Sequence, residues 1–402
     1  LSPDGDVFVT GVTTSSTVKV GGGVTISESG IEASGIGITV ANINGAQIGG
    51  RRNIIINGAM QVAQRGTSFT NISNTGVIGS VDRMVMVGAN LDELAFAGKQ
   101  TSDGPDGFAN CFEFDVTTAE NALDANDLAY IRYKVEGQDL VPLFNADGTG
   151  KDFTLSFYVK AYQAGTYQLN IYKNQGPRFI SKTYTVDASA TWQRVVIPFT
   201  GDTGTTGMND DNGNGFQIAW ILVAGTDYTS AGVLPNWGGW PGNTGFAGGQ
   251  AVNVASSANN YFRITGIQLE LGSQATAFEH RSFGEELSLC QRYYYMHALG
   301  NGKNVGTGVL YQDNNLFPSI QFPVILRSTP TLDVSDGSDY FLAYSDGGSD
   351  GFSTFSALWN AHSTCAGLNA YSADGVSGRT AGHSSMIIAN HASARLGFSA
   401  EL

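Results

Sequence analysis

Hydrophobic and polar residues alternate along much of this chain, which is the period of a β-strand with one buried face. The segments 153–160 and 167–171 place an apolar side chain at every second position, and Ala164 and Gly165 lie between them as a turn signal. We therefore expect these two strands to pair as a hairpin. The same alternation marks further half-buried strands at 112–116, 131–135, 195–199 and 216–222.

The alternation shifts by one position within the strand that begins at Phe262. Phe262 and Ile264 share one phase, whereas Ile267 and Leu269 share the other. An extra residue at Gly266, which tolerates a bulged backbone because it has no Cβ, would turn both sets toward one core. The sequence therefore predicts a β-bulge at this glycine.

The period changes to that of a helix after this strand. Ser282 is followed three residues later by Glu285, the pattern of a capping box at a helix start. We expect one linking helix over 282–298. Apolar residues recur there at the spacing of one helical face, at Phe283, Leu287, Cys290 and Tyr294.

The first 52 residues combine many glycines with isoleucines at intervals of five to seven. One chain of this composition cannot bury those side chains by itself, whereas three parallel copies wound about a common axis could. The pattern therefore favours a thin trimeric β-shaft over a flexible Gly/Ser linker, which is the alternative. The isoleucines are Ile26, Ile31, Ile36, Ile43 and Ile48.

The composition of the whole chain favours strands and turns. Of its 402 residues 53 are glycine and only 14% are charged, whereas helical proteins carry more Glu, Lys, Leu and Ala. We expect an all-β protein whose main domain is an antiparallel jelly-roll β-sandwich. The expected order is a fibre shaft over 1–52, the sandwich over 53–281, the helix over 282–298 and a small distal β-domain, the tip, over 299–402.

Charge and hydropathy argue against two classes of partner. The net charge of -14 and the lack of clustered Lys and Arg disfavour nucleic acid. The longest apolar run, 218–225, is far shorter than the roughly 20 residues of a membrane span, so no membrane insertion is expected. The polar opening predicts no signal peptide. Cys111, Cys290 and Cys365 are too few and too widely spaced for a disulfide framework, which suits assembly in a reducing cytoplasm.

Two groups of motifs, one at each end of the expected sandwich, resemble a known family. The opening group is RNIIING at 52–58, QRGT at 64–67 and VDR at 81–83, and the closing group is QLELG at 268–272, AFEHR at 277–281, GEEL at 284–287 and LCQRYY at 289–294. In this order they resemble a domain widespread in bacteriophage tail fibres, although Met84 stands where the family usually has Trp. The resemblance implies a jelly roll like those of carbohydrate-binding modules, carried on a trimeric fibre.

The resemblance also implies a role in attachment. We expect a virion tail fibre, a homotrimer assembled in the host cytoplasm, that contacts other tail or virion proteins and binds a receptor, expected to be a glycan, on the host surface. A purely structural fibre of the tail or capsid is the alternative. A polysaccharide depolymerase is least favoured, because no repetitive β-helix or pair of catalytic acids is recognisable. The G-x-S-x-G pattern at Gly347 is not followed by a helix, so we expect no enzyme.

Aromatic side chains in glycine-rich loops are the candidate ligand-binding residues. Sugars present C–H faces that stack on such rings, although a ring in the sandwich loop could equally cap the core. We expect the tip to contact the host, with the sandwich loop as the competing site. The candidates are Trp237, Trp240 and Phe246 in the loop 234–249, and Tyr340, Tyr344 and Trp359 in the tip.

One loop resembles part of a calcium site. Asp210, Asn212 and Asn214 match its first alternating oxygen ligands, but position twelve is Ile221 instead of the bidentate Glu that closes such a loop. We therefore expect no cofactor, with a weak calcium site at these residues as the alternative.

Overall fold

The chain divides into two units, Leu1–Gly50 and Arg51–Leu402. The computed structural model describes residues 17–20, 24–27, 30–33, 42–43, 46–47, 51–72, 77–78, 80–120, 122–312, 314–370, 376 and 379–402.

The first unit contains short antiparallel strands in its described residues. β1, β2 and β3 form a three-stranded sheet in which Ile26 lies opposite Ile31, and β4 pairs with β5. Ile36 and Ile48 lie outside the described residues, and the trimeric shaft remains a prediction. The strands are β1 Thr17–Val20, β2 Val24–Ser27, β3 Gly30–Ala33, β4 Asn42–Ile43 and β5 Ala46–Gln47.

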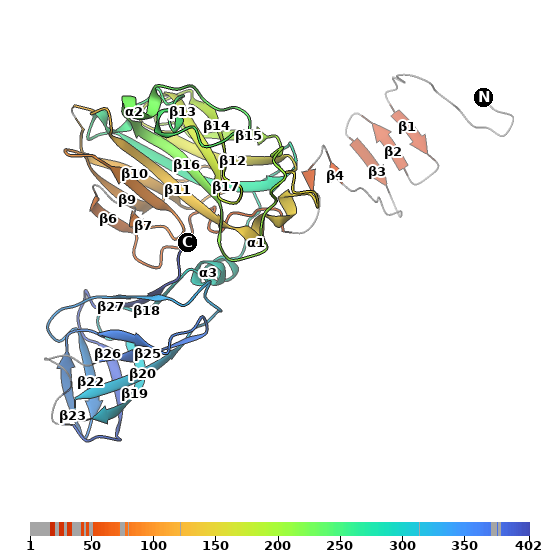
Figure 1. The fold of residues 1–402 in the computed structure, drawn as a ribbon. Coiled ribbons are helices and arrows are strands. Elements are labelled where there is room, and N and C mark those ends of the chain that lie inside the picture. The colour runs from red at the N-terminus through yellow and green to blue at the C-terminus, as the bar shows by residue number, and fades with distance from the viewer. Residues whose placement is uncertain are drawn as a thin grey trace. The chain divides into compact units, whose positions relative to one another are not determined.

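The second unit begins with a sandwich of two six-stranded antiparallel sheets (Figure 1). Its strands are β6 Ser68–Ile72, β7 Val77–Ile78, β8 Val85–Ala89, β9 Ala95–Thr101, β10 Cys111–Thr118, β11 Leu128–Glu136, β12 Phe153–Ala161, β13 Gly165–Lys173, β14 Arg178–Val186, β15 Gln193–Phe199, β16 Asn214–Ala224 and β17 Tyr261–Leu271. Sheet A has the order β15-β12-β17-β10-β9-β6, and sheet B has the order β14-β13-β16-β11-β8-β7.

This strand order is that of a jelly roll. Numbered one to eight along the chain, strands β10 to β17 stand in the order 6-3-8-1 in sheet A and 5-4-7-2 in sheet B, the arrangement of two Greek keys. The strands β9 and β6 extend sheet A, and β8 and β7 extend sheet B. The predicted all-β jelly-roll sandwich is therefore confirmed.

The predicted hairpin between 153–160 and 167–171 is wrong. β12 lies in sheet A, whereas β13 lies in sheet B and pairs with β14 and β16. Both strands alternate because each has one face on the same core, from opposite sides. Alternation identifies a buried face but not the neighbouring strand, so a connection that crosses between sheets has the same sequence pattern as a hairpin.

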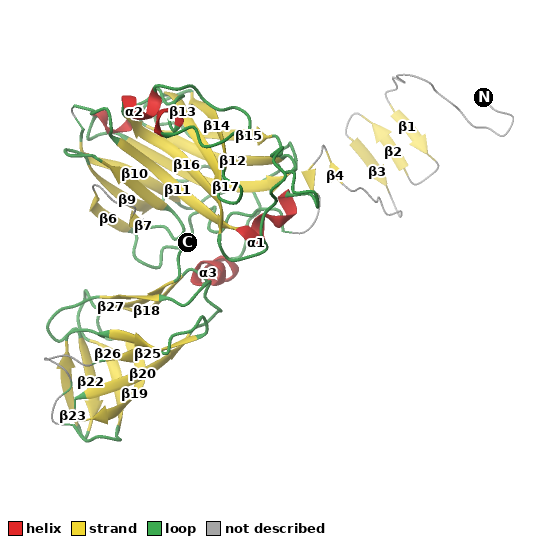
Figure 2. Cartoon of the chain, viewed as in Figure 1, coloured by secondary structure: helices red, strands yellow, loops and turns green. Residues whose placement is uncertain are grey.

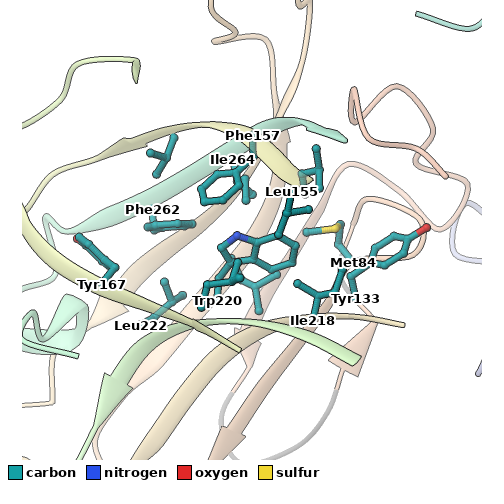
Figure 3. Packing of buried hydrophobic residues seen from close by; sticks show 14 of the residues in the cluster. Met84, Tyr133, Leu155, Phe157, Tyr167, Ile218, Trp220, Leu222, Phe262 and Ile264 are labelled. Carbon is teal, nitrogen blue, oxygen red and sulfur yellow. The ribbon is translucent and has the colours of Figure 1, made fainter. Parts of the chain in front are cut away.

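The two sheets enclose one hydrophobic core (Figure 3). The rings of Trp220 from sheet B and Phe157 from sheet A are 5.9 Å apart between centroids and almost perpendicular. Tyr167 and Phe262 make a second contact between the sheets, at 5.6 Å. Met84, at the position of the family's Trp, is buried in the same core.

The predicted β-bulge at Gly266 is confirmed. The register of β17 against β12 shifts there, since Gln268 lies opposite Ser156 but Thr265 lies opposite Tyr158. Gly266 has a φ of 60°, a left-handed conformation that favours glycine. The bulge places the apolar residues on both sides of it in one core, as their buried side chains show.

The two motif groups meet in space at the start and end of the sandwich. The side-chain amide of Asn53 donates to the carbonyl oxygen of Ile267 at 3.1 Å, and the backbone N–H of Asn57 donates to the carboxylate of Glu286 at 2.5 Å. Arg281 pairs with the same carboxylate at 3.3 Å. The motifs that carry the resemblance therefore fasten the first segment of the domain to its last strand and to the helix that follows.

The linking helix is confirmed but shorter than predicted. α3 spans Phe283–Gln291, and the Ser282 hydroxyl accepts a hydrogen bond from the Glu285 N–H at 3.3 Å, as the capping box predicts. In the described residues the other α-helices have four residues each, α1 Gly137–Leu140 and α2 Thr226–Thr229 (Figure 2). Short 3-10 turns occur at Val141–Leu143, Asn243–Gly245 and Val254–Ser256.

The predicted apolar face of this helix is partly wrong. Phe283 is exposed, whereas Glu286 and Cys290 are buried, and Tyr294 lies beyond the helix in the next strand. The carboxylate of Glu286 faces inward because it accepts the hydrogen bonds of Asn57 and Arg281. A buried acid with partners of this kind rotates the helix away from the orientation that its apolar spacing predicts.

The tip contains two antiparallel sheets around one core. Sheet C has the order β23-β22-β26-β19-β20-β25-β24, and sheet D has the order β18-β27-β21. Phe341 of sheet C and Phe398 of sheet D belong to the same buried cluster. The strands are β18 Tyr294–Leu299, β19 Asn304–Gln312, β20 Asn315–Gln321, β21 Thr331–Val334, β22 Phe341–Ser345, β23 Gly348–Phe352, β24 Ala357–Trp359, β25 Cys365–Asn369, β26 Ser384–Ala389 and β27 Arg395–Ser399.

Charged side chains connect the sandwich with the tip. The guanidinium of Arg83 lies 3.4 Å from the ring centroid of Tyr293 and bonds to Glu401 at 2.6 Å. Arg292, which follows the helix, donates two hydrogen bonds to the Glu136 carboxylate, at 2.9 and 2.8 Å. Such two-point pairs fix orientation as well as distance.

Candidate functional site

Trp237 belongs to the core of the sandwich. Its side chain is 9% exposed, its ring is 6.0 Å from that of Phe216, and its Nε1 donates to the carbonyl oxygen of Thr200 at 2.9 Å. A tryptophan whose ring is covered and whose polar atom is satisfied offers a ligand no surface. For this residue the structure therefore favours the alternative of core capping over ligand binding.

Trp240 and Phe246, from the same loop, lie on the outer face of sheet B. They border a pocket of about 320 Å³, which we call the sheet B pocket. Trp240 is 48% exposed, and the rings of Tyr172 and Phe179 meet it almost at right angles, at 5.7 and 5.4 Å between centroids. The other residues that line the sheet B pocket are Tyr130, Arg132, Asn170, Gln217 and Ala219.

Hydrogen bonds hold the loop against sheet B. The carbonyl oxygen of Phe246 accepts from the side-chain amides of Gln168 at 2.8 Å and Asn170 at 2.7 Å. Gly238 exchanges two backbone hydrogen bonds with Phe179, at 2.8 and 2.9 Å. The loop that carries Trp240 is thus fixed to the neighbouring strands β13 and β14.

The three candidates in the tip have different surroundings. Tyr340 is partly buried and stacks on His391, with 4.3 Å between centroids and 8° between planes. Tyr344 is exposed on the outer face of sheet C, opposite Met386 on the neighbouring strand. Trp359 is 49% exposed at the end of β24. Trp359 and Tyr344 line two different pockets, and Tyr340 lines neither of these.

Trp359 borders a groove on the outer face of sheet C, with a volume of about 580 Å³, which we call the tip groove. Its ring meets Phe317 edge-on at 4.7 Å, and Phe317 meets Tyr311 at 5.9 Å. Gly367 lies opposite both Trp359 and Ser319 in the strand register, so the floor carries no side chain there. Sequence analysis missed Tyr311 and Phe317, because Trp359, which lines the same groove, lies more than 40 positions away along the chain.

The tip groove is mainly apolar but also carries an exposed tyrosine and several neutral polar groups. Tyr311 is 72% exposed, which is unusual for an aromatic residue in a strand. The polar groups at the rim are Ser319, Asn360 and His362, and among the described lining residues none is Asp, Glu, Lys or Arg. The groove can therefore offer stacking surfaces and neutral hydrogen-bonding groups.

The loop that resembles part of a calcium site contacts the tip. The side-chain amide of Asn212 donates to the carbonyl oxygen of Arg327 at 2.6 Å, and Arg327 donates to the carbonyl oxygen of Asn212 at 3.1 Å. Asp210 is exposed, and Asn214 begins β16. Throughout the part of the chain that the structure describes, no three side chains of His, Cys, Asp or Glu are grouped to hold a metal ion.

The fold and these two pockets define the chain as a jelly-roll protein with two candidate ligand-binding surfaces. No helix in its described residues is long and apolar enough to cross a membrane. No protein-family model matches the sequence, and no curated protein matches it either.

Solved structures with some similarity come from phage and from bacterial carbohydrate-binding proteins. One is the enzymatically active domain of tailspike protein 4 from Bacteriophage CBA120, with 13% identity, a TM-score of 0.29, and 55% of this chain and 21% of that chain covered. A putative sugar binding protein from Bacteroides thetaiotaomicron has 12% identity, a TM-score of 0.30 and coverages of 55% and 100%.

A third is the family 11 carbohydrate-binding module from Clostridium thermocellum, solved with a β-1,3-1,4-mixed-linked tetrasaccharide. It has 14% identity, a TM-score of 0.27 and coverages of 52% and 99%. This chain spans only about a fifth of the tailspike chain. TM-scores of this size do not establish a common fold, so the jelly roll is assigned here from strand order and register.

Proposed function

We propose that this chain is a receptor-binding tail fibre protein of a bacteriophage, which attaches to a glycan on the host surface through the tip groove. The observation that carries the proposal is the aromatic lining of that groove, formed by the exposed rings of Trp359 and Tyr311 and the half-buried ring of Phe317. The viral role is supported by the resemblance of the two motif groups, whose residues have a structural part in joining the ends of the sandwich.

The chemistry of the groove suits a neutral sugar. The C–H face of a pyranose stacks on an aromatic ring, and the sugar hydroxyls need neutral partners such as Asn360 and Ser319. An exposed apolar groove without charged lining would bind nucleic acid or a strongly charged peptide poorly. Cys365 and Gly367, both small, leave room along the floor.

The proposed activity is adhesion without bond cleavage. Attachment of this kind needs no cofactor and no metal. The affinity of one groove is expected to be modest, and three copies in a homotrimer, with several fibres per particle, would raise it through effective concentration. The protein would be assembled in the host cytoplasm, and within the virion the N-terminal unit would contact the other tail proteins.

The test is a glycan array probed with the intact chain and with Trp359→Ala. Tyr162→Ala is the matched control, since this ring is 46% exposed on the sandwich and lies outside the groove. We expect reproducible binding that Trp359→Ala abolishes and Tyr162→Ala retains, with melting temperature and oligomeric state unchanged in both.

Other outcomes would overturn the proposal. If wild-type protein binds none of the glycans, a structural fibre is the better account. If Trp359→Ala dissociates an oligomer, the outer face of sheet C is a contact between copies of the chain. Release of oligosaccharide from bound polysaccharide would instead indicate a depolymerase.

A further inference from the structure

We propose that the sheet B pocket is a second binding site and that its ligand is an acidic saccharide, a sugar that carries a carboxylate. The pocket lies on the sandwich and shares no residue with the tip groove. This inference therefore does not depend on the function proposed for the tip.

The pocket is built on three neighbouring strands of sheet B. In the strand register Ala219 of β16 lies opposite both Arg132 of β11 and Asn170 of β13. Because the methyl group of Ala219 is short, the longer side chains on both sides of it enclose a depression. Trp240 closes one side from the loop above. The volume of about 320 Å³ is near the lower limit of pockets that hold small ligands, roughly 300 to 1,000 Å³.

Trp240 is held as a fixed stacking surface. Tyr172, Phe179 and Phe246 surround it at 5.4 to 5.8 Å between centroids, yet about half of its side chain remains exposed. A ring that is fixed by other rings loses little conformational freedom when a ligand binds. Such a surface favours the apolar face of a sugar ring.

Arg132 provides the charge that specifies the ligand. Arg178, Arg263 and Arg292 each pair with a carboxylate, whereas Arg132 makes no salt bridge in the described part of the chain. It interacts with the neutral hydroxyl of Tyr130, which also lines the pocket. Its Nε is buried without a partner. A guanidinium has five donors arranged to grip a carboxylate with two parallel hydrogen bonds.

The unpaired arginine is notable because the chain as a whole is acidic, with a net charge of -14. Lys134 lies two residues further along β11, and burial and the positive charge of Arg132 lower its pKa. Its ammonium donates to the carbonyl oxygen of Leu402 at 2.7 Å and does not neutralise the site. The pocket therefore combines local positive charge with a stacking ring, which together match an acidic sugar better than a neutral one.

An amide is free to bind the hydroxyls of such a ligand. Gln217, next to Tyr172 in the register, lines the pocket, and its side-chain amide has no hydrogen-bond partner among the described residues. The Asn170 amide, by contrast, is occupied by the carbonyl oxygen of Phe246 and by Gln168. We assign Arg132 to the carboxylate, Trp240 to the ring face and Gln217 to the hydroxyls.

The experiment is calorimetric titration of the full chain with trigalacturonate, and with galactotriose as the neutral counterpart. We expect trigalacturonate to bind and galactotriose to bind at least about tenfold more weakly. Arg132→Gln should weaken trigalacturonate binding by about tenfold or more, with Arg132→Lys intermediate, because a lysine keeps the charge but loses the two-point geometry.

The controls separate this site from others. Arg51→Gln removes an equal charge from an exposed position and should leave binding unchanged. Trp359→Ala should also leave it unchanged, since that residue lies in the tip groove. If Arg132→Gln lowers the melting temperature, Ala219→Leu tests the site by filling it, and should abolish binding.

The proposal fails if the wild-type chain does not bind trigalacturonate, if the two sugars bind equally well, or if Arg132→Gln and Ala219→Leu both bind like wild type. Loss of trigalacturonate binding in Trp359→Ala but not in Arg132→Gln would place the acidic sugar in the tip groove instead.

Discussion

The guanidinium of Arg83 is almost completely removed from solvent but remains charged. Burial, the largest single influence, lowers the pKa of Arg83, but the combined attraction of Glu401, Tyr293 and Tyr133 raises it above its usual value. The ring of Tyr293 at 3.4 Å adds a cation–π contact. Because removal of one partner of a buried ion pair commonly costs about 3 to 5 kcal/mol, this motif arginine is important for holding the tip on the sandwich.

The carboxylate of Asp82, which precedes Arg83 in the sequence, predicts how the stability of the protein depends on pH. Burial raises the pKa of Asp82 to about 6, although the Gln64 side chain and backbone both donate hydrogen bonds to it. The unfolded chain has a pKa near 4, so the folded state binds the proton more tightly. The contribution of Asp82 to the free energy of unfolding therefore falls by about 3 kcal/mol as pH rises from below about 4 to above 6.

This prediction is checked by urea unfolding of wild type and Asp82→Asn at several pH values. The difference between the two free energies of unfolding should change in favour of the variant by roughly 2 kcal/mol between pH 4 and pH 7, since the unfolded carboxyl is already about half ionised at pH 4. Parallel pH profiles would show that Asp82 does not titrate in this range.

For single residues, the sequence identified aromatic side chains that could bind a ligand, but it did not predict which residues surround them. Trp237 and Trp240 are three residues apart in one loop, yet one is buried and the other is half exposed. Arg132 could have been placed on the outer face of its strand, because Ile131 and Tyr133 alternate with it. That Ala219 and Trp240 lie beside it could not be inferred, since strand order decides which distant residues become neighbours.

At the scale of elements, local patterns were predicted more successfully than pairings. The capping box of α3 and the bulge in β17 depend on residues within a few positions of each other, and both were predicted correctly. The pairing of β12 was not, because its partners β15 and β17 are chosen by the long-range packing of the sandwich. The turn of polar residues at Asn212 likewise has a partner, Arg327, that lies 115 residues away.

A glycine at the meeting point of the two motif groups gives a prediction for these elements. A Cβ on Gly58 would lie 2.2 Å from the carbonyl oxygen of Ile267, in the bulged part of β17. Gly58→Ala must therefore displace backbone from backbone, and we expect it to lower the free energy of unfolding by about 1 to 3 kcal/mol or more. Denaturant unfolding measures the change.

The matched control is Gly284→Ala in the first turn of α3. Nothing lies within 4 Å of a Cβ at Gly284, and alanine is favoured over glycine in a helix by up to about 1 kcal/mol. This variant should be as stable as wild type or slightly more so. If both variants behaved alike, the close approach of Gly58 to Ile267 would not limit stability.

At the scale of the whole molecule, we predict a parallel homotrimer. Sedimentation equilibrium should give three times the chain mass of 42.3 kDa. A chain that begins at Arg51, the first residue of the second unit, should associate more weakly, because it lacks the isoleucine-containing segment for which the sequence predicts a trimeric shaft. A monomeric or dimeric intact chain would contradict the prediction, and an equally stable trimer without residues 1–50 would place the association elsewhere.

The place of β17 in sheet A has a consequence for biosynthesis. This strand is the last of the sandwich along the chain, yet it lies between β12 and β10 in the middle of the sheet. A nascent polypeptide that has emerged from the ribosome only as far as β16 therefore has a sheet with an open centre, with two strand edges unpaired. Such edges invite pairing with other chains, and copies made side by side on one messenger are close enough to do so. The domain can close only after Leu271 has left the exit tunnel, which makes the interval before that moment the time when a chaperone would be most useful.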